Sequence, residues 1–593
     1  MNTTVTNIAH GDSIIEERLA VSTKRQYQNK VDHFEHWVRI VHFEELVDED
    51  TDEIMYENIG CEVLKEFLGH VSKKRKRKEE TAEEPFVYCD PEKLQSVQHV
   101  NGYKSALTDK FKRLGISLDF ESKTMFSDMM IGYRRVIQKK KQDGEIEIRE
   151  GKFPLSFSGY RFLAKKAMQQ STDFQQTVFA HIFLLFCWNM IARCVSVSLL
   201  TFTHISWEED SMVVVFPTTK SDKVGKNSSP IHIFANRKSP EICPILWFAV
   251  YIWCMGFRRQ GSQTTVFGAQ KETQSRFSKW LQKVCGSNTS ELLLMGIIIA
   301  EIGTHSFRKG VANFLSALCG GPSSVAIYLR AGWSLGPVTS RYIMEGEGND
   351  QLAGRAATGL PITEPEFADL PPHFDQSEGA VLSVDQWEEI LPGYSTFYPQ
   401  SFRQVLPFLL ASLVYHRNYL KDNLSASHPI FLTRLWTSNT INELSEKIYC
   451  GTGKHPVTQM TATGIPPHIL LANEIVALRA EMACMKDALI ERLSDIPEQV
   501  RVSMLNNFRI DGTIPITITQ VESMMQAMQA SLLAAIAEQT VRQQTAIAAV
   551  SSTHSTASTL QVQSFHWSGR FHPVPNTFRF PRYYLFCYHF IVR

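Results

Sequence analysis

The chain of 593 residues lacks the usual marks of metal-binding, secreted and membrane proteins. Its eleven cysteines are scattered, with no C-x-x-C pair and no His/Cys cluster at zinc spacing, which argues against a structural metal and for a reducing compartment. There is no apolar signal core at the start, and no stretch reaches about 18 uninterrupted apolar residues. A carboxylate metal cluster and a P-loop are also missing. We therefore expect a soluble intracellular protein that needs neither a metal nor another cofactor.

Apolar residues make up 44% of the chain, which is enough for sizeable cores, and the length suits three or four domains. The formal net charge is zero, which by itself argues neither for nor against nucleic acid. However, Lys and Arg outnumber Asp and Glu over 101–170, whereas 41–57 is strongly acidic. The average therefore hides a basic region.

Two groups of basic residues are candidates for phosphate contact. Residues 73–78 are six consecutive cations, which repel one another and predict an exposed loop, either a nuclear-import signal or a DNA-contacting loop. A merely solvated charge run would look the same. A second group ends the helix expected at 124–141, where cations also suit a helix C-terminus. The candidate DNA-binding residues are Lys73, Lys74, Arg75, Arg134, Arg135, Lys139, Lys140 and Lys141.

The first half of the chain is mainly helical by pattern. A Ser or Thr cap at 22–23 precedes Tyr27, Val31, Phe34 and Val38 at helical spacing. Further helices are expected near 91–114, 124–141, 154–170, 174–192 and 245–256. Residues 212–216 and 231–234 predict two strands of a hairpin whose connection carries Lys220. The helix at 174–192 is strongly apolar, so we expect it to be buried, with Arg193 directly after it.

Residues 301–360 contain the most informative pattern. His305-x-x-Arg308 opens the first of two helices, which are joined by Gly-Gly-Pro at 320–322. Trp333 follows, and Tyr342 comes nine residues after it. These polar residues fall near the ends of elements, where side chains can converge on a substrate. Each residue alone has an ordinary structural explanation, and only their combination indicates a site.

The order Arg193, Lys220, His305, Arg308, Trp333 and Tyr342 resembles the catalytic pattern of tyrosine recombinases, the phage-integrase superfamily. The stretch GEGNDQLAGRAATGLP at 346–361 is similar to the crypton branch, a class of eukaryotic DNA transposons. Many members carry an acidic residue three positions after the first Arg, where this chain has Ser196. This departure weakens the expected support for Arg193. Lys223 and Lys226 on the same connection leave the choice of Lys220 open.

The resemblance implies a reaction that the residue types can perform. The phenol of Tyr342 would attack phosphorus to form a 3′-phosphotyrosyl bond, with Arg193 and Arg308 holding the non-bridging oxygens. Lys220 would protonate the leaving 5′ oxygen, and His305 would assist proton transfer from the tyrosine. Trp333 would pack against the site and donate its indole N–H to a phosphate oxygen.

The expected fold is mainly α with a small β-sheet. The resemblance implies an N-terminal helical core-binding domain at 1–148 and a catalytic domain at 149–374. An accessory helical region follows at 375–465, with apolar helices expected near 403–415 and 428–436. At 466–500, Leu471, Ile475, Leu478, Met482, Met485 and Leu489 alternate in steps of four and three, which suits a short coiled coil or an ordinary bundle helix. We expect 501–564 to be of low complexity and partly disordered. Residues 565–593 resemble a truncated DNA-binding module.

These observations favour a transposon-encoded, site-specific tyrosine recombinase of the crypton type that acts on double-stranded DNA in the nucleus. Self-association, from dimer to tetramer on DNA, is implied by the resemblance. The main alternative is a domesticated, catalytically inactive DNA-binding or regulatory protein with the same fold. A type IB topoisomerase shares the chemistry, but the crypton-like stretch after Tyr342 argues against it.

Overall fold

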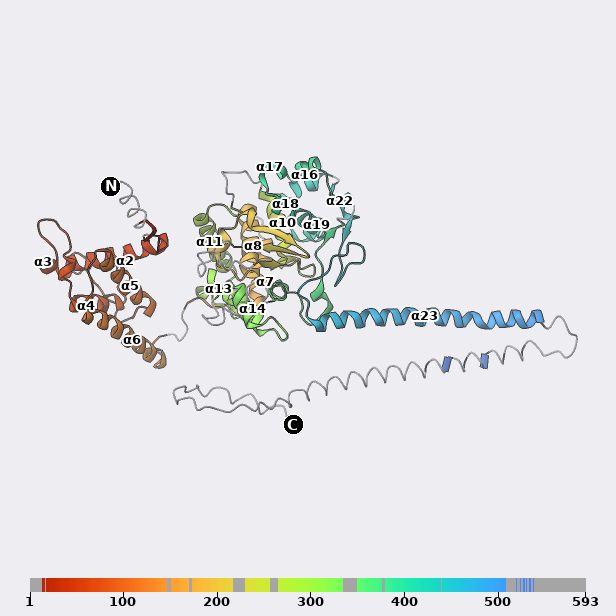
Figure 1. Ribbon diagram of the computed structural model, residues 1–593, viewed down its shortest axis with the longest axis horizontal. Helices are drawn as coiled ribbons and strands as arrows, with labels where there is room; N and C mark the ends of the chain where they lie inside the picture. The colour runs from red at the N-terminus through yellow and green to blue at the C-terminus, as the bar shows by residue number, and fades with distance from the viewer. Residues whose placement is uncertain are drawn as a thin grey trace, which may run out of the picture. The chain divides into compact units, whose positions relative to one another are not determined.

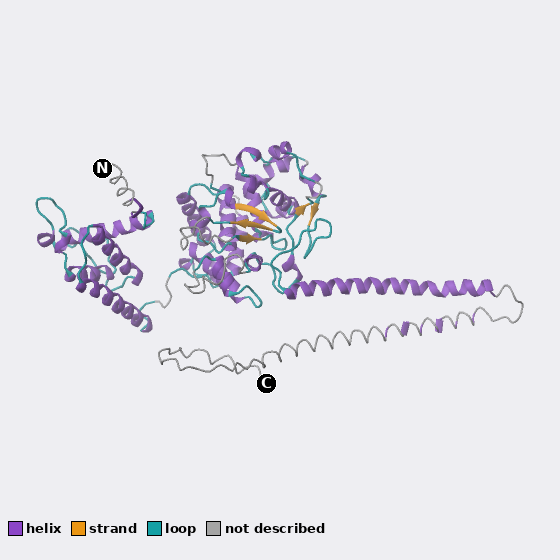
Figure 2. Cartoon of the chain, in the orientation of Figure 1, coloured by secondary structure: helices purple, strands orange, loops and turns teal. Residues whose placement is uncertain are grey.

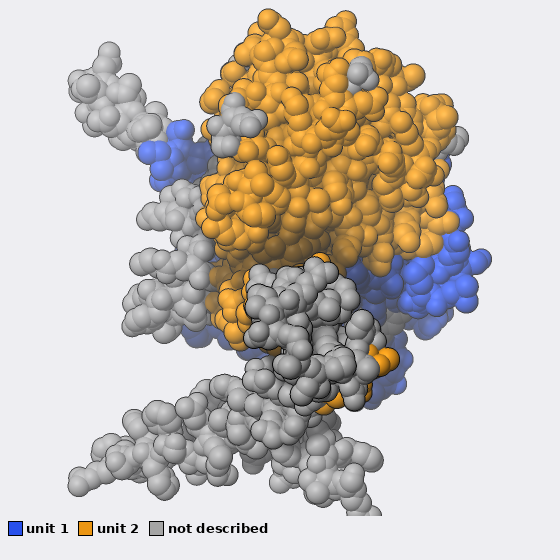
Figure 3. Space-filling model, turned by 90° about the vertical axis from the view of Figure 1, so that its right-hand side faces the viewer, with its two compact units in different colours: residues 1–160, 278–311 blue, residues 161–277, 312–593 orange. Residues whose placement is uncertain are grey.

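The computed structural model describes residues 13–15, 17–146, 151–169, 173–216, 230–255, 265–333, 349–375, 379–438 and 440–507, with scattered helical positions between 519 and 537. The chain forms two compact units, residues 1–160 with 278–311 and residues 161–277 with 312–593 (Figure 3). Helices dominate and the strands are few and short, so the predicted fold class, mainly α with a small sheet, is confirmed (Figures 1 and 2).

The first unit begins with a helical core. Helix α2 buries Val31, Phe34, Trp37 and Val38 at helical spacing and packs against α5. The side chain of Ser96 caps α5 by accepting from the backbone N–H of His99. The helices of this part are α2 (Val21–Val41), α3 (Phe43–Leu46), α4 (Cys61–Ser72), α5 (Val97–Arg113) and α6 (Phe120–Gln142); α12 (Thr289–Leu294) also belongs to the unit.

The second unit is built around two apolar helices. In α8 (Phe174–Asn189), every residue from Thr177 to Asn189 is buried, which explains why its sequence shows no polar face. It packs against α10 (Pro244–Met255), which is also largely buried. The expected helix at 174–192 begins at the right residue, but α8 ends at Asn189, three residues earlier than expected. Three helices, α7 (Phe157–Gln169), α11 (Gln270–Ser287) and α13 (Thr304–Ala317), include the positions where the chain passes from one unit to the other.

A three-stranded antiparallel sheet lies in the second unit (Figure 2). Strand β1 (Ile205–Glu208) pairs with β2 (Ser211–Val214), and β2 pairs with β3 (Ile231–Ile233). The pairing of β2 with β3 agrees with the expected hairpin, although its connection at 217–229, with Lys220, lies outside the described residues. The sequence pattern did not predict β1.

The region after residue 374 packs into the second unit rather than forming a separate one. Strand β4 (His373–Phe374) pairs with β5 (Ile448–Tyr449), and the rings of Trp207 and Phe408 stack with centroids 3.8 Å apart. The expected helix at 428–436 is instead a 3₁₀ turn at Pro429–Leu432 followed by α21 (Arg434–Thr437). The other helices are α9 (Cys194–Ser198), α14 (Ser324–Arg330), α15 (Asp350–Ala357), α16 (Val384–Ile390), α17 (Tyr394–Phe397), α18 (Gln400–Arg403), α19 (Leu406–Tyr415), α20 (Arg417–Asn423), α22 (Thr440–Ser445) and α23 (Pro467–Asn507).

No helix in the described ranges combines the length and the apolar character that a membrane span needs. Within the same ranges, no group of three or more His, Cys, Asp or Glu side chains is arranged to hold a metal ion.

Candidate active site

His305 and Arg308 are the second and fifth residues of α13 (Thr304–Ala317). The i, i+3 spacing places them on neighbouring positions of one helix face, as the His-x-x-Arg pattern requires. His305 is exposed, whereas Arg308 is 7% exposed. Because the N-terminus of a helix carries positive partial charge, this end of α13 suits a phosphate group.

The segment at 152–155, just before α7, fixes the start of α13. The backbone N–H of Leu155 donates to the carbonyl of Ser306 at 3.0 Å, and Lys309 Nζ donates to the carbonyl of Lys152 at 2.8 Å. A Cβ at Gly310 would lie 2.1 Å from the carbonyl oxygen of Leu155, so glycine is needed for this close approach. The segment therefore holds the turn that carries His305.

Arg193 follows a sharp turn at the end of α8. Ile191 has φ +49°, in the left-handed region that β-branched residues rarely adopt, and its N–H donates to the carbonyl of Trp188 at 3.1 Å. Across the same turn, the sulfur atoms of Cys187 and Cys194 lie 3.5 Å apart. The half-buried Arg193 precedes the first residue of α9. Buried packing thus holds a strained turn immediately before the arginine.

Trp333 is half-buried at the end of the turn that follows α14. Its backbone N–H donates to the carbonyl of Tyr328 at 2.9 Å, and the two rings meet edge to face with centroids 5.2 Å apart. The position of Trp333 is therefore tied to α14. Tyr342 lies in 334–348, outside the described residues.

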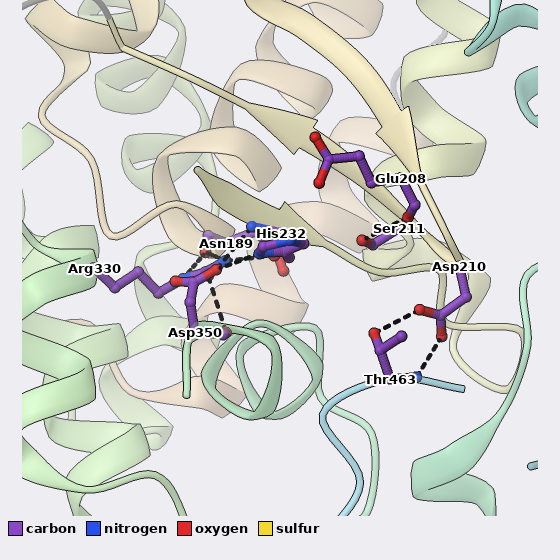
Figure 4. Close-up of polar contacts among 8 residues, drawn as sticks. All are labelled: Asn189, Glu208, Asp210, Ser211, His232, Arg330, Asp350 and Thr463. Carbon is purple, nitrogen blue, oxygen red and sulfur yellow. Dashed lines mark hydrogen bonds and ion pairs between the residues drawn. The ribbon is translucent and has the colours of Figure 1, made fainter. Parts of the chain in front are cut away.

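Arg330 and Asp350 border the segment that carries Trp333 and Tyr342. The guanidinium of Arg330 lies 2.5 Å from the carboxylate of Asp350, and the arginine side chain is completely buried (Figure 4). Arg330 also donates to the carbonyl of Asn189 at 2.8 Å and to that of His232 at 2.8 Å. One side chain therefore joins α14 and α15 to the end of α8 and to β3.

The Asp350 carboxylate has a second partner in His232. It accepts from the backbone N–H at 2.8 Å and from Nδ1 at 3.0 Å. Burial by itself raises the pKa of Asp350, but the charge of Arg330 and the hydrogen bonds from His232 outweigh it, and the pKa lies below its usual value. Asp350 is therefore an ionised anchor at the start of α15.

Helix α15 is fixed at a second point by another buried ion pair. The buried guanidinium of Arg355 pairs with the buried carboxylate of Asp210 in the β1–β2 turn. Asp210 also accepts from the hydroxyl of Thr463 at 2.7 Å (Figure 4). Burial raises the pKa of Asp210 despite these partners. At Gly354, a Cβ would lie 2.4 Å from the carbonyl oxygen of His232, so α15 packs directly on β3.

The basic run at 73–78 is more ordered than the expected exposed loop. Lys73 and Arg75 form isolated β-bridges with Leu94 and Tyr88. The Arg75 side chain is 12% exposed, pairs with Glu80 and contacts Nε2 of His70 at 3.1 Å. The loop expectation is therefore wrong for the Arg75 side chain, because its paired backbone turns that side chain inward. Lys74 and residues 77–78 are exposed.

The second basic group lies on the last turns of α6. Arg134, Arg135 and Lys139 are exposed, while Lys140 pairs with Glu145 at 2.5 Å and Lys141 is half-buried. Exposed cations at this end of the helix are available to phosphate groups.

The structure describes four of the six predicted site residues, and these four are divided between the two units. His305 and Arg308 share one helix turn in the first unit, and Arg193 and Trp333 end separate elements of the second. Lys220 and Tyr342 lie outside the described residues. The sequence pattern missed the residues that fix the framework, because charged residues so far apart in the chain give no local signal. These are Asp210, His232, Arg330, Asp350 and Arg355.

No protein-family model and no curated protein matches the chain. Among solved structures, the XerH site-specific recombinase bound to difH substrate is 14% identical, covers 53% of this chain and 73% of its own, and has a TM-score of 0.30. An FLP recombinase–Holliday junction complex is 12% identical, with coverage of 55% and 80% and a TM-score of 0.30. A Flpe–Holliday junction complex is 11% identical, with coverage of 69% and 99% and a TM-score of 0.29. Scores this low say nothing of function, which is inferred below from this chain's own residues.

Proposed function

We propose that the chain is a tyrosine recombinase that cuts and rejoins DNA through a 3′-phosphotyrosyl intermediate. The observation that carries the proposal is the ordered set from Arg193 to Tyr342, within which His305 and Arg308 lie one turn apart at the start of α13. The strained turn before Arg193 and the anchored ends of the Tyr342 segment support it, because strain and buried ion pairs fix functional groups.

In the proposed reaction, the phenolic oxygen of Tyr342 attacks the scissile phosphorus while the bond to the 5′ oxygen breaks. Negative charge grows on the non-bridging oxygens, and the guanidiniums of Arg193 and Arg308 stabilise it with bidentate hydrogen bonds. A lysine could not make the same paired contacts. Because most of the Arg308 side chain is removed from water, its interaction with phosphate would be strong.

Two proton transfers accompany the attack. Lys220 protonates the leaving 5′ oxygen, and His305, exposed at the helix start, assists removal of the phenol proton. Trp333 packs beside the phosphate and donates its indole N–H. The phosphotyrosyl bond keeps the free energy of the broken linkage, so the 5′ hydroxyl of another strand can reverse the reaction without a metal or ATP.

We further propose that the DNA partner is duplex and that the exposed cations of α6 and of the 73–78 run contact its backbone. The exposed part of that run also suits a nuclear-import receptor, which supports a nuclear location. The crypton-like stretch at 346–361 supports an origin in a DNA transposon, for which the reaction would be excision and integration. Recombination requires two DNA partners, so the working form would be an oligomer on DNA.

The decisive test uses a nicked duplex that carries the element's own termini, incubated with the protein in EDTA. Wild type should give a protein–DNA adduct that survives denaturation, and Tyr342→Phe should give none. Tyr415→Phe, at an exposed tyrosine remote in sequence from the set, is the matched control and should react as wild type. Arg308→Lys should form adduct roughly 10²–10³-fold more slowly, because it loses one transition-state donor pair.

The other outcomes separate the alternatives. An adduct with Tyr342→Phe would contradict the assigned nucleophile. No adduct from wild type, with a retained gel shift, would favour the catalytically inactive DNA-binding or regulatory protein. Loss of both adduct and DNA binding would contradict the recombinase proposal for this chain.

A further inference from the structure

Helix α23 carries an apolar stripe that the body of the second unit does not bury. Its first turn is anchored, because Ile469 is fully buried and His468 Nε2 contacts the carbonyl oxygen of Ile362 at 3.1 Å. The helix then continues as a long rod (Figure 1). Five apolar side chains beyond the anchor are 48–62% exposed: Leu471, Ile475, Leu478, Met482 and Met485.

The exposed stripe has heptad spacing. With Ile475 and Met482 at a positions, Leu471, Leu478 and Met485 fall at d, and Leu489 continues the series at a in the sequence. A sustained a/d repeat of about three heptads is the signature of a coiled-coil seam. Ile at a with Leu at d, as in 475 and 478, favours two strands. Pro497 marks where a regular seam would end.

The charges beside the seam identify the partner. Glu474 and Glu481 occupy g positions, and Arg479 and Lys486 occupy e positions; all four are exposed. In a parallel, in-register pair, each g residue faces the e residue five positions later on the other helix. Glu474 would then meet the second copy's Arg479, and Glu481 its Lys486, so every such pair is of opposite charge.

The same charges disfavour the antiparallel arrangement. There, g faces g and e faces e, so glutamate would face glutamate and the cations would face one another, which is repulsive. The apolar stripe and the charge pattern therefore both fit the same partner, which is a second copy of α23 that runs parallel to the first. We propose that residues 471–489 of two chains form a parallel two-stranded coiled coil that makes the protein a dimer without DNA. This inference does not rest on the recombinase chemistry.

The first experiment measures the mass of the full chain by light scattering after gel filtration without DNA. Wild type should have twice the single-chain mass of 67.4 kDa. Ile475→Asp, at the centre of the seam, should halve that mass. Val476→Asp is the matched control, because Val476 is the next residue, is 56% exposed, and lies outside the seam at b.

The second experiment tests the charge pairs. Glu474→Lys with Glu481→Lys makes the flanks uniformly positive, and Arg479→Glu with Lys486→Glu makes them uniformly negative. Each double variant alone should be largely single-chain, and an equimolar mixture should return to twice the mass. All four substituted positions are exposed, so each double variant should keep the fold of the second unit. Circular dichroism would verify this.

The third experiment tests direction. Leu471→Cys should form an interchain disulfide under oxidation, because identical d residues meet across a parallel seam. An antiparallel pair would instead place residue 471 opposite 489. The wild-type chain, whose exposed Cys484 lies outside the seam at c, controls for background crosslinking.

Each contrary result overturns the proposal. A single-chain mass for wild type would mean that the stripe is covered within one chain, for instance by residues after 507. A double mass that persists in Ile475→Asp would place the dimer contact elsewhere. Equal loss in Val476→Asp would contradict the heptad assignment. The mass is measured without DNA and the chemistry is measured by the adduct assay with a nicked duplex. A failure to dimerise can therefore be distinguished from a loss of DNA cleavage.

Discussion

The guanidinium of Arg330 and the carboxylate of Asp350 meet at 2.5 Å, and the segment between these two residues carries Trp333 and Tyr342. The ion pair therefore joins the two ends of the segment that carries the proposed nucleophile, Tyr342. Because Arg330 also binds the carbonyl of Asn189, the same group is connected to the turn that leads to Arg193. One buried side chain thus links the framework of two proposed catalytic positions.

Breaking this ion pair should destabilise the second unit. In Arg330→Met the Asp350 charge loses its buried partner, and we expect the free energy of unfolding to fall by about 3–5 kcal/mol. Urea unfolding measures this loss. Lys238→Ala is the control, because Lys238 pairs with Glu366 at 3.2 Å but is 63% exposed, and should cost at most about 1 kcal/mol. Equal losses would mean that Arg330 has no special structural role.

Adding one methyl group at Gly310 should disturb the start of α13. Gly310→Ala places Cβ against the carbonyl oxygen of Leu155, so the helix or the segment must shift, at a cost of about 1–3 kcal/mol. Adduct formation should slow as well, since His305 and Arg308 would move with the helix. Gly132→Ala in α6 meets nothing within 4 Å and should stabilise by about 0.5–1 kcal/mol. A neutral Gly310→Ala would contradict the close approach.

Neighbouring cations of the basic run should have separable roles. Lys74 is exposed, so Lys74→Ala should leave stability within about 0.5 kcal/mol but lower the salt slope of DNA binding by about 0.9. Arg75→Ala removes the contacts with Glu80 and His70 and should cost about 1–3 kcal/mol. Thermal unfolding and salt-dependent gel shifts measure the two effects. If both variants changed only the salt slope, the inward position of Arg75 would be wrong.

Mild acid should destabilise the second unit. Burial lowers the pKa of His181 to about 3, against an opposing hydrogen bond to the carbonyl of Glu241, and burial lowers the pKa of His416 and His428 to about 4. Below pH of about 6.5 the unfolded chain takes up protons that the folded chain does not. Stability should therefore fall by up to roughly 1.4 kcal/mol per pH unit for each histidine, until the folded pKa is reached.

Asp350 also makes stability depend on pH, but in a lower range. The pKa of its carboxyl is lowered by its partners, whereas the pKa of the histidines is lowered by burial. Its folded pKa is depressed, so its contribution is complete above the usual carboxyl pKa of about 3.9 and is lost as pH falls through the folded value. Urea midpoints at pH 7.5, 6 and 5 isolate the histidine range. His181→Gln should have a shallower pH slope there than wild type, and an unchanged slope would contradict a buried neutral His181.

The main helices could be predicted because they bury regular stripes. The expected helices near 91–114 and 124–141 correspond to α5 and α6, and the two expected strands to β2 and β3. Strand β1 was missed because its sequence, Ile-Ser-Trp-Glu, lacks the continuous apolar run of Met212–Val214 that indicated β2. The buried pairing of Arg355 with Asp210, 145 positions apart, could not be predicted, since charged residues are ordinarily exposed and only the fold brings these together.

Some features of the candidate site could also be predicted from the sequence, whereas others could not. Residue types and spacing suggested His305 and Arg308, and the structure adds their common helix turn. The strained φ of Ile191 has no sequence signal, because it results from packing at the end of α8. The expected domain end at 374 came from the family resemblance, yet the chain continues in the same compact unit, since β5 returns to pair with β4.

The bond from Thr463 to Asp210 also decides how the protein can be shortened for crystallisation or NMR. A fragment ending at 374 would lose Thr463 and β5 and leave the buried Asp210 short of a hydrogen-bond donor. A fragment ending just after Ile469 would retain both, together with the buried first turn of α23, and would omit the exposed stripe. The shortest well-folded piece of this unit therefore ends about a hundred residues later than the recombinase resemblance indicates.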